Sequence, residues 1–198
     1  AAMADRLKAK VPTLEHIVVI GSGDDRDFEA VLNAPGKRVE AATAASADDV
    51  VQLLYTSGTT GEPKGVMHTN NTLLNSVRYF EDRVRLIAND VVLMASPMAH
   101  QTGFLVGLLL PLYLGGRVVL QDIWNPAKAV DIIETERVTM TMASTPFLAD
   151  LTTEAERRPE ALRSLRTFVS AGAPIPRVLV RRATQTLGAH IVSGWGMT

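Results

Sequence analysis

The chain has 198 residues, a hydrophobic content of 46% and a formal net charge of −1. Such a chain can bury a sizeable core in one domain or in two small ones. The near-neutral charge argues against a dedicated nucleic-acid-binding protein, which would usually carry a strong basic excess. The sequence has no cysteine, which excludes disulfides and thiolate metal sites. We therefore expect a reducing compartment and predict a cytoplasmic protein.

Two segments could be mistaken for membrane or targeting signals. Residues 1–10 are mixed polar and charged, a composition that fits neither a signal peptide nor a transit peptide. The longest apolar run, residues 104–114, is shorter than the roughly 20 residues that a membrane-spanning helix needs. We interpret this run as a buried helix that Pro111 ends or kinks, and we expect no transmembrane segment.

The first part of the chain predicts little regular structure before residue 50. Residues 16–21 form a continuous apolar run that ends in glycine, the pattern of a strand buried on both faces. Apolar residues within the acidic segment 24–33 have the spacing of a short helix. Residues 34–49 are rich in Ala, Pro, Gly, Ser and Asp and predict a loop. The strand predicted at 50–55 then leads into the most informative stretch of the sequence.

Residues 55–66 read Tyr-Thr-Ser-Gly-Thr-Thr-Gly-Glu-Pro-Lys-Gly-Val, with three glycines, four Ser or Thr hydroxyls and one lysine. Glycine permits a positive φ and a close approach of the backbone, so that successive N–H groups can converge on an anion. Hydroxyls and an ammonium group add charge-assisted hydrogen bonds. The stretch therefore predicts a polyphosphate-binding loop with a returning strand after it. Its candidate ligands are Thr56, Ser57, Gly58, Thr59, Thr60, Gly61 and Lys64.

Two other interpretations of this loop fit less well. A Walker-type P-loop has the spacing G-x-x-x-x-G-K-[ST], whereas only two residues separate Gly58 from Gly61, and Lys64 precedes Gly65. A surface hairpin without a ligand would explain the turn residues. It would not explain why hydroxyls fill nearly every position between the glycines.

After the loop, strands and helices alternate regularly. Thr69 or Asn70 can cap a helix with an apolar stripe at 73, 77, 80 and 84. Strands are predicted at 91–95, 117–120, 138–142, 167–170 and 190–193, with helices at 104–114, 126–136, 146–155 and 177–187. This alternation predicts an α/β fold with an open, doubly wound, mostly parallel sheet and helices on both faces. We predict two subdomains, 1–68 ending in the loop and 69–198.

Three further segments each follow a predicted strand, namely 96–103, 170–176 and 194–198. Ligands of open parallel sheets bind outside the carboxyl ends of the strands, so these segments can converge on one site. Each is a weak signal by itself. A lone histidine such as His100 is more often a helix cap than a catalyst, and Trp195 could be part of the core.

Taken in order, these segments resemble the motifs of the adenylate-forming superfamily, which includes acyl-CoA synthetases, luciferases and the adenylation domains of peptide synthetases. Residues 55–66 resemble its phosphate-loop signature. Residues 97–103 resemble its histidine segment beside the acyl pocket, and 170–176 its adenine-side turn. Residues 194–198 resemble the start of its aromatic-Gly-Met-Thr-Glu motif.

The resemblance implies an ATP-dependent carboxylic acid–CoA ligase that uses ATP, Mg²⁺ and CoA. It implies that Lys64, His100 and Thr198 act at the reacting groups and that Thr56 approaches the metal. The other implied nucleotide contacts are Ser57, Gly58, Thr59, Thr60, Gly61, Gly172, Ala173, Pro174, Gly194, Trp195, Gly196 and Met197. The implied partners are a carboxylic acid, ATP and CoA, without nucleic acid.

The acid is predicted to be apolar, because no lysine or arginine lies between His100 and residue 114. A second carboxylate buried there would stay unpaired. Small residues would leave width for a ring or a branched chain. Residues 121–126 and 143–148 also resemble, more loosely, the cyclohexanecarboxylate–CoA ligase branch. The candidate acid-binding residues are His100, Gly103, Phe104, Gly107 and Ala171.

The resemblance covers nearly the whole chain, whereas the chain covers a central slice of the family's large N-terminal domain. The family's glutamate after the motif threonine, its ribose-binding aspartate and its catalytic C-terminal lysine do not occur in these 198 residues. We therefore expect the 198-residue chain to be inactive by itself and its parent to be the ligase. The alternatives are a non-catalytic nucleotide-binding module and a P-loop phosphotransferase. The oligomeric state stays open.

Overall fold

The computed structural model describes residues 2–36, 46–58 and 61–198, and its compact units are Ala1–Ala44 and Ala45–Thr198. The first unit contains helices α1 (Ala2–Lys10) and α2 (Phe28–Asn33). The Asp27 side chain caps α2 by accepting a hydrogen bond from the Glu29 N–H. Arg26 pairs with Asp5 and Asp24 at 2.7 and 2.8 Å, and its hydrogen bond lowers the pKa of Asp24 to about 2.

The strand predicted at residues 16–21 is wrong. Within that stretch the structure has only an isolated bridge between Val19 and Asp27. Val18 is 50% exposed and Ile20 is 87% exposed, so the run is not buried on both faces. A strand needs a partner, and Asp27 is the one bridge partner among the described residues of this unit. Helix α1 was not predicted, because its mixed composition shows no apolar stripe.

The second unit begins with an antiparallel hairpin, strands β1 (Val50–Thr56) and β2 (Lys64–Thr69). Helix α3 (Asn70–Val84) follows directly. Thr69 caps it in a capping box, in which the Thr69 side chain accepts from the Thr72 N–H and the Thr72 side chain accepts from the Thr69 N–H. The hairpin and the cap occur as predicted. The predicted subdomain boundary after residue 68 stays a prediction.

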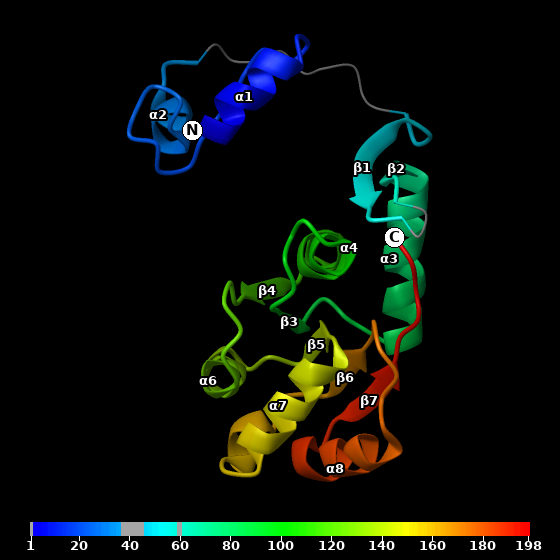
Figure 1. The fold of residues 1–198 in the computed structure, drawn as a ribbon. Helices are drawn as coiled ribbons and strands as arrows, with labels where there is room; N and C mark the ends of the chain where they lie inside the picture. Colours follow the sequence, from blue (N-terminus) through cyan, green and yellow to red (C-terminus); the bar gives the residue numbers. More distant parts are fainter. Residues whose placement is uncertain (1, 37–45, 59–60) are drawn as a thin grey trace. The chain divides into compact units, whose positions relative to one another are not determined.

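A parallel five-stranded sheet forms the centre of this unit, in the order β4-β3-β5-β6-β7 (Figure 1). The strands are β3 (Val91–Met94), β4 (Arg117–Leu120), β5 (Met140–Ala143), β6 (Thr167–Ser170) and β7 (His190–Ser193). The helices between them are α4 (Gln101–Phe104), η1 (Leu105–Leu109), α5 (Leu110–Leu114), α6 (Pro126–Glu136), α7 (Thr145–Ala155), η2 (Pro159–Leu162) and α8 (Arg177–Leu187). The α/β fold is confirmed.

Segments α4, η1 and α5 form one continuous helix with a π-helical turn in the middle. The Leu110 N–H donates to the Leu105 carbonyl, five residues earlier. Pro111 follows immediately and has no N–H to donate. The wide turn therefore lies where proline interrupts the helical hydrogen bonds, and the helix continues to Leu114.

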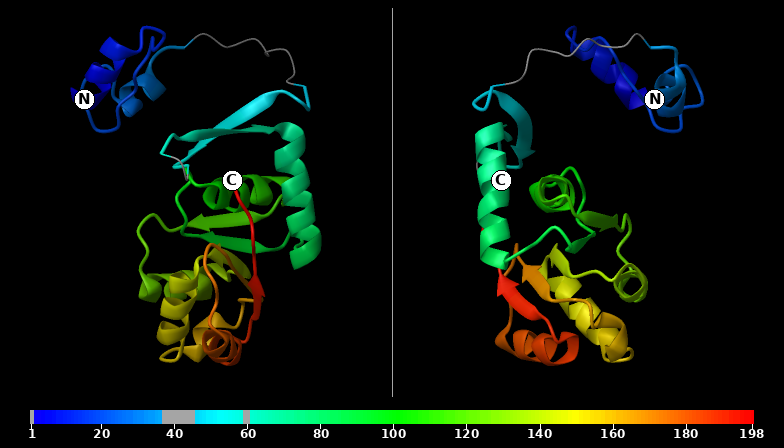
Figure 2. Two further views of the ribbon diagram at one scale, coloured as in Figure 1. Left: turned by 45° about the vertical axis from the view of Figure 1, so that its right-hand side comes forward. Right: turned by 180° about the vertical axis from the view of Figure 1, so that it is seen from behind.

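Helices cover both faces of the sheet, as Figures 1 and 2 show, and strand β3 contributes to both cores. Val91 and Leu93 pack with α6, α7 and α8. Val92 and Met94 pack with α3, η1 and α5. Alternate residues of a strand point to opposite faces, so this continuous apolar run is buried on both faces of the sheet.

Among the described residues, none of the helices combines the length and apolar character that a membrane span requires.

Candidate nucleotide and acid site

The predicted phosphate loop connects the two strands of the hairpin. Gly58 has φ +65° and Gly61 has φ +93°, a backbone conformation that favours glycine. A Cβ added to Gly58 would lie 2.2 Å from the Glu62 carbonyl oxygen, so the turn needs glycine for space as well. Ser57 and Lys64 lie on either side of this turn and are exposed. Thr59 and Thr60 lie outside the described residues.

Thr56 and Lys64 are direct partners in the register of the hairpin. Among the described residues, the Thr56 hydroxyl has one loose contact, 3.5 Å from the Lys64 carbonyl oxygen, so it can turn toward another partner. The described residues contain no group of three His, Cys, Asp or Glu side chains that could hold a metal. Magnesium usually keeps phosphate and water ligands and takes few from the protein. A single hydroxyl fits a magnesium ion of that kind.

The carboxyl ends of β3 and β5 form a topological switch point. From β3 the chain runs into α4 on one face, and from β5 it runs into α7 on the other. Ligands of open α/β sheets bind at such points. The segments 96–103, 170–176 and 194–198 all begin at this edge, as predicted. The last of them runs from β7 toward the β1–β2 hairpin in Figures 1 and 2.

His100 is the N-cap of α4, and its Nδ1 accepts a hydrogen bond from the Thr102 N–H at 3.1 Å. This contact assigns the proton of the neutral ring to Nε2, which is then a donor. The ring is exposed. The alternative role of a helix cap is thus confirmed, and it leaves Nε2 available for a ligand oxygen.

Gly103 and Gly107 have a packing role that the sequence did not reveal. A Cβ on Gly103 would lie 2.1 Å from the Pro97 carbonyl oxygen, and one on Gly107 would lie 2.6 Å from Met94 Cγ. Neighbouring atoms therefore occupy the space beside both glycines. The assignment of both glycines to the acid pocket stays a prediction. Phe104 beside them is half-buried.

The predicted adenine-side turn follows β6 directly. The Ala171 N–H donates to the Ala143 carbonyl at 3.1 Å, and Gly172 has φ +87°. Gly172, Ala173 and Pro174 are exposed.

The segment after β7 is held at its first residue. The Gly194 N–H donates to the Ser170 carbonyl at 2.8 Å. Trp195 and Met197 are 88% and 85% exposed, so neither belongs to the core among the described residues. Gly196 is exposed as well, and Thr198 is half-buried.

The structure brings together segments 121–126 and 143–148. The rings of Trp124 and Phe147 are 4.6 Å apart, and Trp124 Nε1 donates to Asp150 at 3.0 Å. Thr145, in the second segment, was not singled out by the sequence. Its hydroxyl contacts Ser170 and the carbonyl of Ala173. The signal was a hydroxyl residue between a predicted strand and Pro146, at the same edge as the other candidates.

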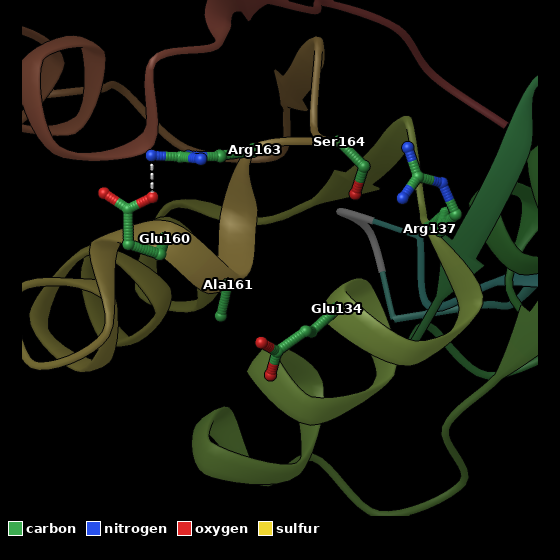
Figure 3. Close-up of a pocket in the computed structure, with 6 residues that line it drawn as sticks. All are labelled: Glu134, Arg137, Glu160, Ala161, Arg163 and Ser164. Carbon is green, nitrogen blue, oxygen red and sulfur yellow. Dashed lines mark ion pairs between the residues drawn. The ribbon is translucent and has the colours of Figure 1, made fainter.

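Two surface hollows formed by described residues lie away from the candidate site. One of about 240 Å³ lies between the end of α6 and η2, where the Glu160–Arg163 ion pair borders it (Figure 3). Another of about 430 Å³ is lined by Asp90, Arg117 and Thr139 at the amino ends of the strands. Both therefore lie at the edge opposite the candidate site.

Comparison with known proteins identifies relatives along the whole chain. The family model described as AMP-binding enzyme matches residues 1–198. A medium-chain fatty-acid–CoA ligase of Escherichia coli (strain K12) is 35% identical over 97% of this chain and 34% of its own length. The chain thus spans about a third of that relative.

Solved structures are similar to this chain as well. Apo MatB from Rhodopseudomonas palustris has a TM-score of 0.76 and 28% identity, over 86% of this chain and 33% of that chain. A malonyl-CoA ligase with methylmalonyl-CoA and AMP bound has a TM-score of 0.73 and 25% identity, over 80% and 35%. The AMP-binding enzyme model matches all 198 residues, and the chain therefore belongs to the AMP-binding enzyme family.

Proposed function

We propose that the parent of this chain is an ATP-dependent carboxylic acid–CoA ligase. One observation carries the proposal: a glycine- and hydroxyl-rich loop ending in Lys64 shares one compact unit with three segments at the carboxyl edge of a parallel sheet. The CoA ligase relative and the ligase structure with AMP and a CoA thioester bound support it.

The reaction has two half-reactions. A carboxylate oxygen attacks the α-phosphorus of ATP, and pyrophosphate leaves with the electrons of the broken P–O bond. The CoA sulfur then attacks the carbonyl carbon of the acyl-adenylate, and AMP leaves. The protein contributes mainly positioning and electrostatic stabilisation of the transferring group.

The residues have distinct roles in this proposal. Ser57, Gly58, Gly61 and Lys64, with Thr59 and Thr60, hold the β- and γ-phosphates. Nε2 of His100 donates to the acid, since Nδ1 is engaged in capping α4. The contacts with adenine and the α-phosphate come from Gly172, Ala173, Pro174, Gly194, Trp195, Gly196, Met197 and Thr198. Bound magnesium would neutralise phosphate charge, with the Thr56 hydroxyl as its ligand from this chain.

The substrate in this proposal is an apolar monocarboxylic acid, alicyclic or fatty. Residues 101–114 carry no charged side chain, and Phe104 and Leu105 at the start of this helix are half-buried. A second carboxylate beside them would lose water without gaining a partner. The E. coli relative is a ligase of medium-chain fatty acids, which agrees with this class. Ala171, His100, Gly103 and Gly107 stay candidate contacts.

Acid-dependent exchange of labelled pyrophosphate into ATP tests the function in the full-length enzyme. The panel is cyclohexanecarboxylate, octanoate, benzoate, succinate and leucine, with a reaction lacking acid as the control. We expect exchange with the apolar monocarboxylates. Absence of exchange with every acid, despite ATP binding, would favour a non-catalytic nucleotide-binding module. Succinate or leucine as the best substrate would overturn the apolar assignment.

The 198-residue chain by itself is proposed to form no acyl-CoA, because it spans about a third of its ligase relative. Thioester formation by the purified chain is measured beside the full-length enzyme, at equal concentration and with the same acid. Thioester production above the enzyme-free background would contradict this proposal.

A further inference from the structure

Thr145, the first residue of α7, has a hydroxyl that faces two neighbouring segments. Its Oγ1 lies 3.3 Å from the Ala173 carbonyl oxygen and 3.5 Å from that of Pro174. It also lies 3.4 Å from the hydroxyl of Ser170, which is fully buried. One side chain thus connects the start of α7 with the end of β6 and with the turn that follows it.

The hydrogen bonding of α7 does not explain this arrangement. Ser144 is the N-cap, and its side chain forms no capping hydrogen bond within the described part of the chain. Two other threonines of α7 use their hydroxyls locally, since Thr152 donates to the Leu148 carbonyl at 2.6 Å and Thr153 to that of Ala149 at 3.0 Å. All three described contacts of the Thr145 hydroxyl go to residues outside α7.

The three contacts can form one chain of hydrogen bonds. A hydroxyl has one proton to donate and two lone pairs that accept. Thr145 can therefore donate to the carbonyl of Ala173 or Pro174 while it accepts the proton of Ser170. This arrangement satisfies the buried Ser170 hydroxyl and fixes the turn at one side.

The same pair lies beneath a second candidate segment. The Ser170 carbonyl accepts the Gly194 N–H at 2.8 Å, at the start of the segment that carries Trp195. The Thr145 hydroxyl thus contacts the adenine-side turn, and the Ser170 backbone, next to that hydroxyl pair, holds the first residue of the segment after β7. The helix that follows His100 packs on the other face of the sheet.

We propose that Thr145 is a positioning residue for the nucleotide, which it serves by holding the 171–174 turn in its binding conformation. This inference rests on the proposed function, which assigns that turn to adenine. Without the hydroxyl, the nucleotide has to order the turn when it binds. The free energy of that ordering is then subtracted from the binding free energy, so the nucleotide affinity falls. The acid is assigned to α4 and Ala171, and Ala171 is held separately by its N–H bond to the Ala143 carbonyl, so acid binding does not share this cost.

Three variants of the full-length enzyme test the proposal. Thr145→Val removes the hydroxyl at nearly constant volume, and Thr145→Ser restores it. Thr152→Val makes the same change on the same helix, away from the turn. The measurements are the Kd of ATP by calorimetry, the KM values of ATP and of the acid in pyrophosphate exchange, and Tm.

We expect Thr145→Val to raise the Kd and KM of ATP about three- to tenfold, the effect of one ordinary hydrogen bond. The KM of the acid should change less than about twofold, and Thr145→Ser and Thr152→Val should stay close to wild type. Unchanged ATP affinity in Thr145→Val would overturn the proposal. An equal loss of ATP affinity in Thr145→Ser and Thr145→Val would overturn it as well. So would an equal rise of the KM of ATP and the KM of the acid in Thr145→Val.

The outcomes separate this inference from the proposed function. A wild-type enzyme that binds ATP without acid-dependent exchange would remove the ligase assignment, and the Kd series would still decide the role of Thr145. Normal exchange with an unaffected Kd in Thr145→Val would remove the inference alone. A wild-type enzyme without ATP affinity would remove both.

Discussion

The Asp90 carboxylate forms an ion pair with the Arg166 guanidinium, although 76 positions separate these residues in the sequence. Asp90 is 2% exposed and precedes β3, whereas Arg166 precedes β6. The carboxylate also accepts from the Thr139 hydroxyl at 2.6 Å and from the Ile87 N–H at 2.8 Å. Burial alone would raise the pKa of Asp90, but these hydrogen bonds and the charge of Arg166 together hold it below its usual value.

Replacing Asp90 by Asn should lower the free energy of unfolding by about 1–3 kcal/mol at neutral pH, because Arg166, Thr139 and the Ile87 N–H lose a charged acceptor at a buried position. A carboxyl whose pKa is lowered in the folded state stabilises the folded protein at pH values above its unfolded-state pKa of about 3.9. This contribution disappears as the pH falls through the folded-state pKa. The difference in unfolding free energy between wild type and Asp90→Asn should therefore be constant near neutral pH and shrink below about pH 4.

Urea unfolding of both proteins at a series of pH values measures this difference. Asp82→Asn, at an exposed position of α3, is the matched control and should give a small, nearly constant difference. A difference between wild type and Asp90→Asn that persisted unchanged in strong acid would show that the carboxylate charge is not what stabilises the sheet.

Lys64→Ala in the full-length enzyme should lower kcat/KM for ATP about ten- to a hundredfold, the equivalent of a charge-assisted hydrogen bond of roughly 1.5–3 kcal/mol. The KM of the acid should hardly change, since the lysine is assigned to the phosphates. Steady-state pyrophosphate exchange measures both quantities. Lys10→Ala, an exposed lysine of α1, controls for loss of positive charge. Wild-type kinetics in Lys64→Ala would exclude this loop as the phosphate site.

Gly103→Ala and Gly107→Ala should differ in stability, although both place the same side chain in one helix. Alanine gains about 1 kcal/mol of helix propensity over glycine at either position. At Gly103 the new Cβ would meet the Pro97 carbonyl at 2.1 Å, and this backbone group cannot move without shifting its loop. At Gly107 it would meet the Met94 side chain at 2.6 Å. Overpacking costs about 1–3 kcal/mol where neighbours cannot yield, so Gly103→Ala should have the lower Tm.

Differential scanning calorimetry compares the two variants with Gly36→Ala, where an added Cβ meets no atom within 4 Å. A Tm of Gly103→Ala at or above that of Gly107→Ala would contradict the packing role. In that case, the interpretation of Gly103 as a residue that leaves room for the acid would be favoured.

The sequence predicted elements well wherever burial follows a simple period. Strands β6 and β7 and helix α8 have their predicted boundaries, because the strands are short apolar runs and the helix carries a stripe of apolar residues. Residues 16–21 have the same apolar character without a strand partner among the described residues, and pairing cannot be read from one segment alone. Strand β5 begins at Met140, two residues later than predicted.

The candidate site was predictable where a residue type has one chemical meaning. The glycines and hydroxyls of the phosphate loop predicted a positive-φ turn, which Gly58 and Gly61 confirm. Glycine in a helix is ambiguous, since room for a ligand and room for a neighbour require the same missing side chain. Only the positions of Pro97 and Met94 separate these meanings at Gly103 and Gly107. Thr145 and Ser170 are 25 residues apart in the sequence, and their contact depends on the register of β5 and β6.

Because β3 supplies Val91 and Leu93 to one core and Val92 and Met94 to the other, neither layer of helices can detach without exposing part of this strand. The free energy of local opening is therefore smallest at the outer elements and largest at β3. Its backbone amides should be the slowest in the chain to exchange with deuterium, at a rate set by unfolding of the whole sheet. The four central residues thus make two helical layers into one cooperative folding unit.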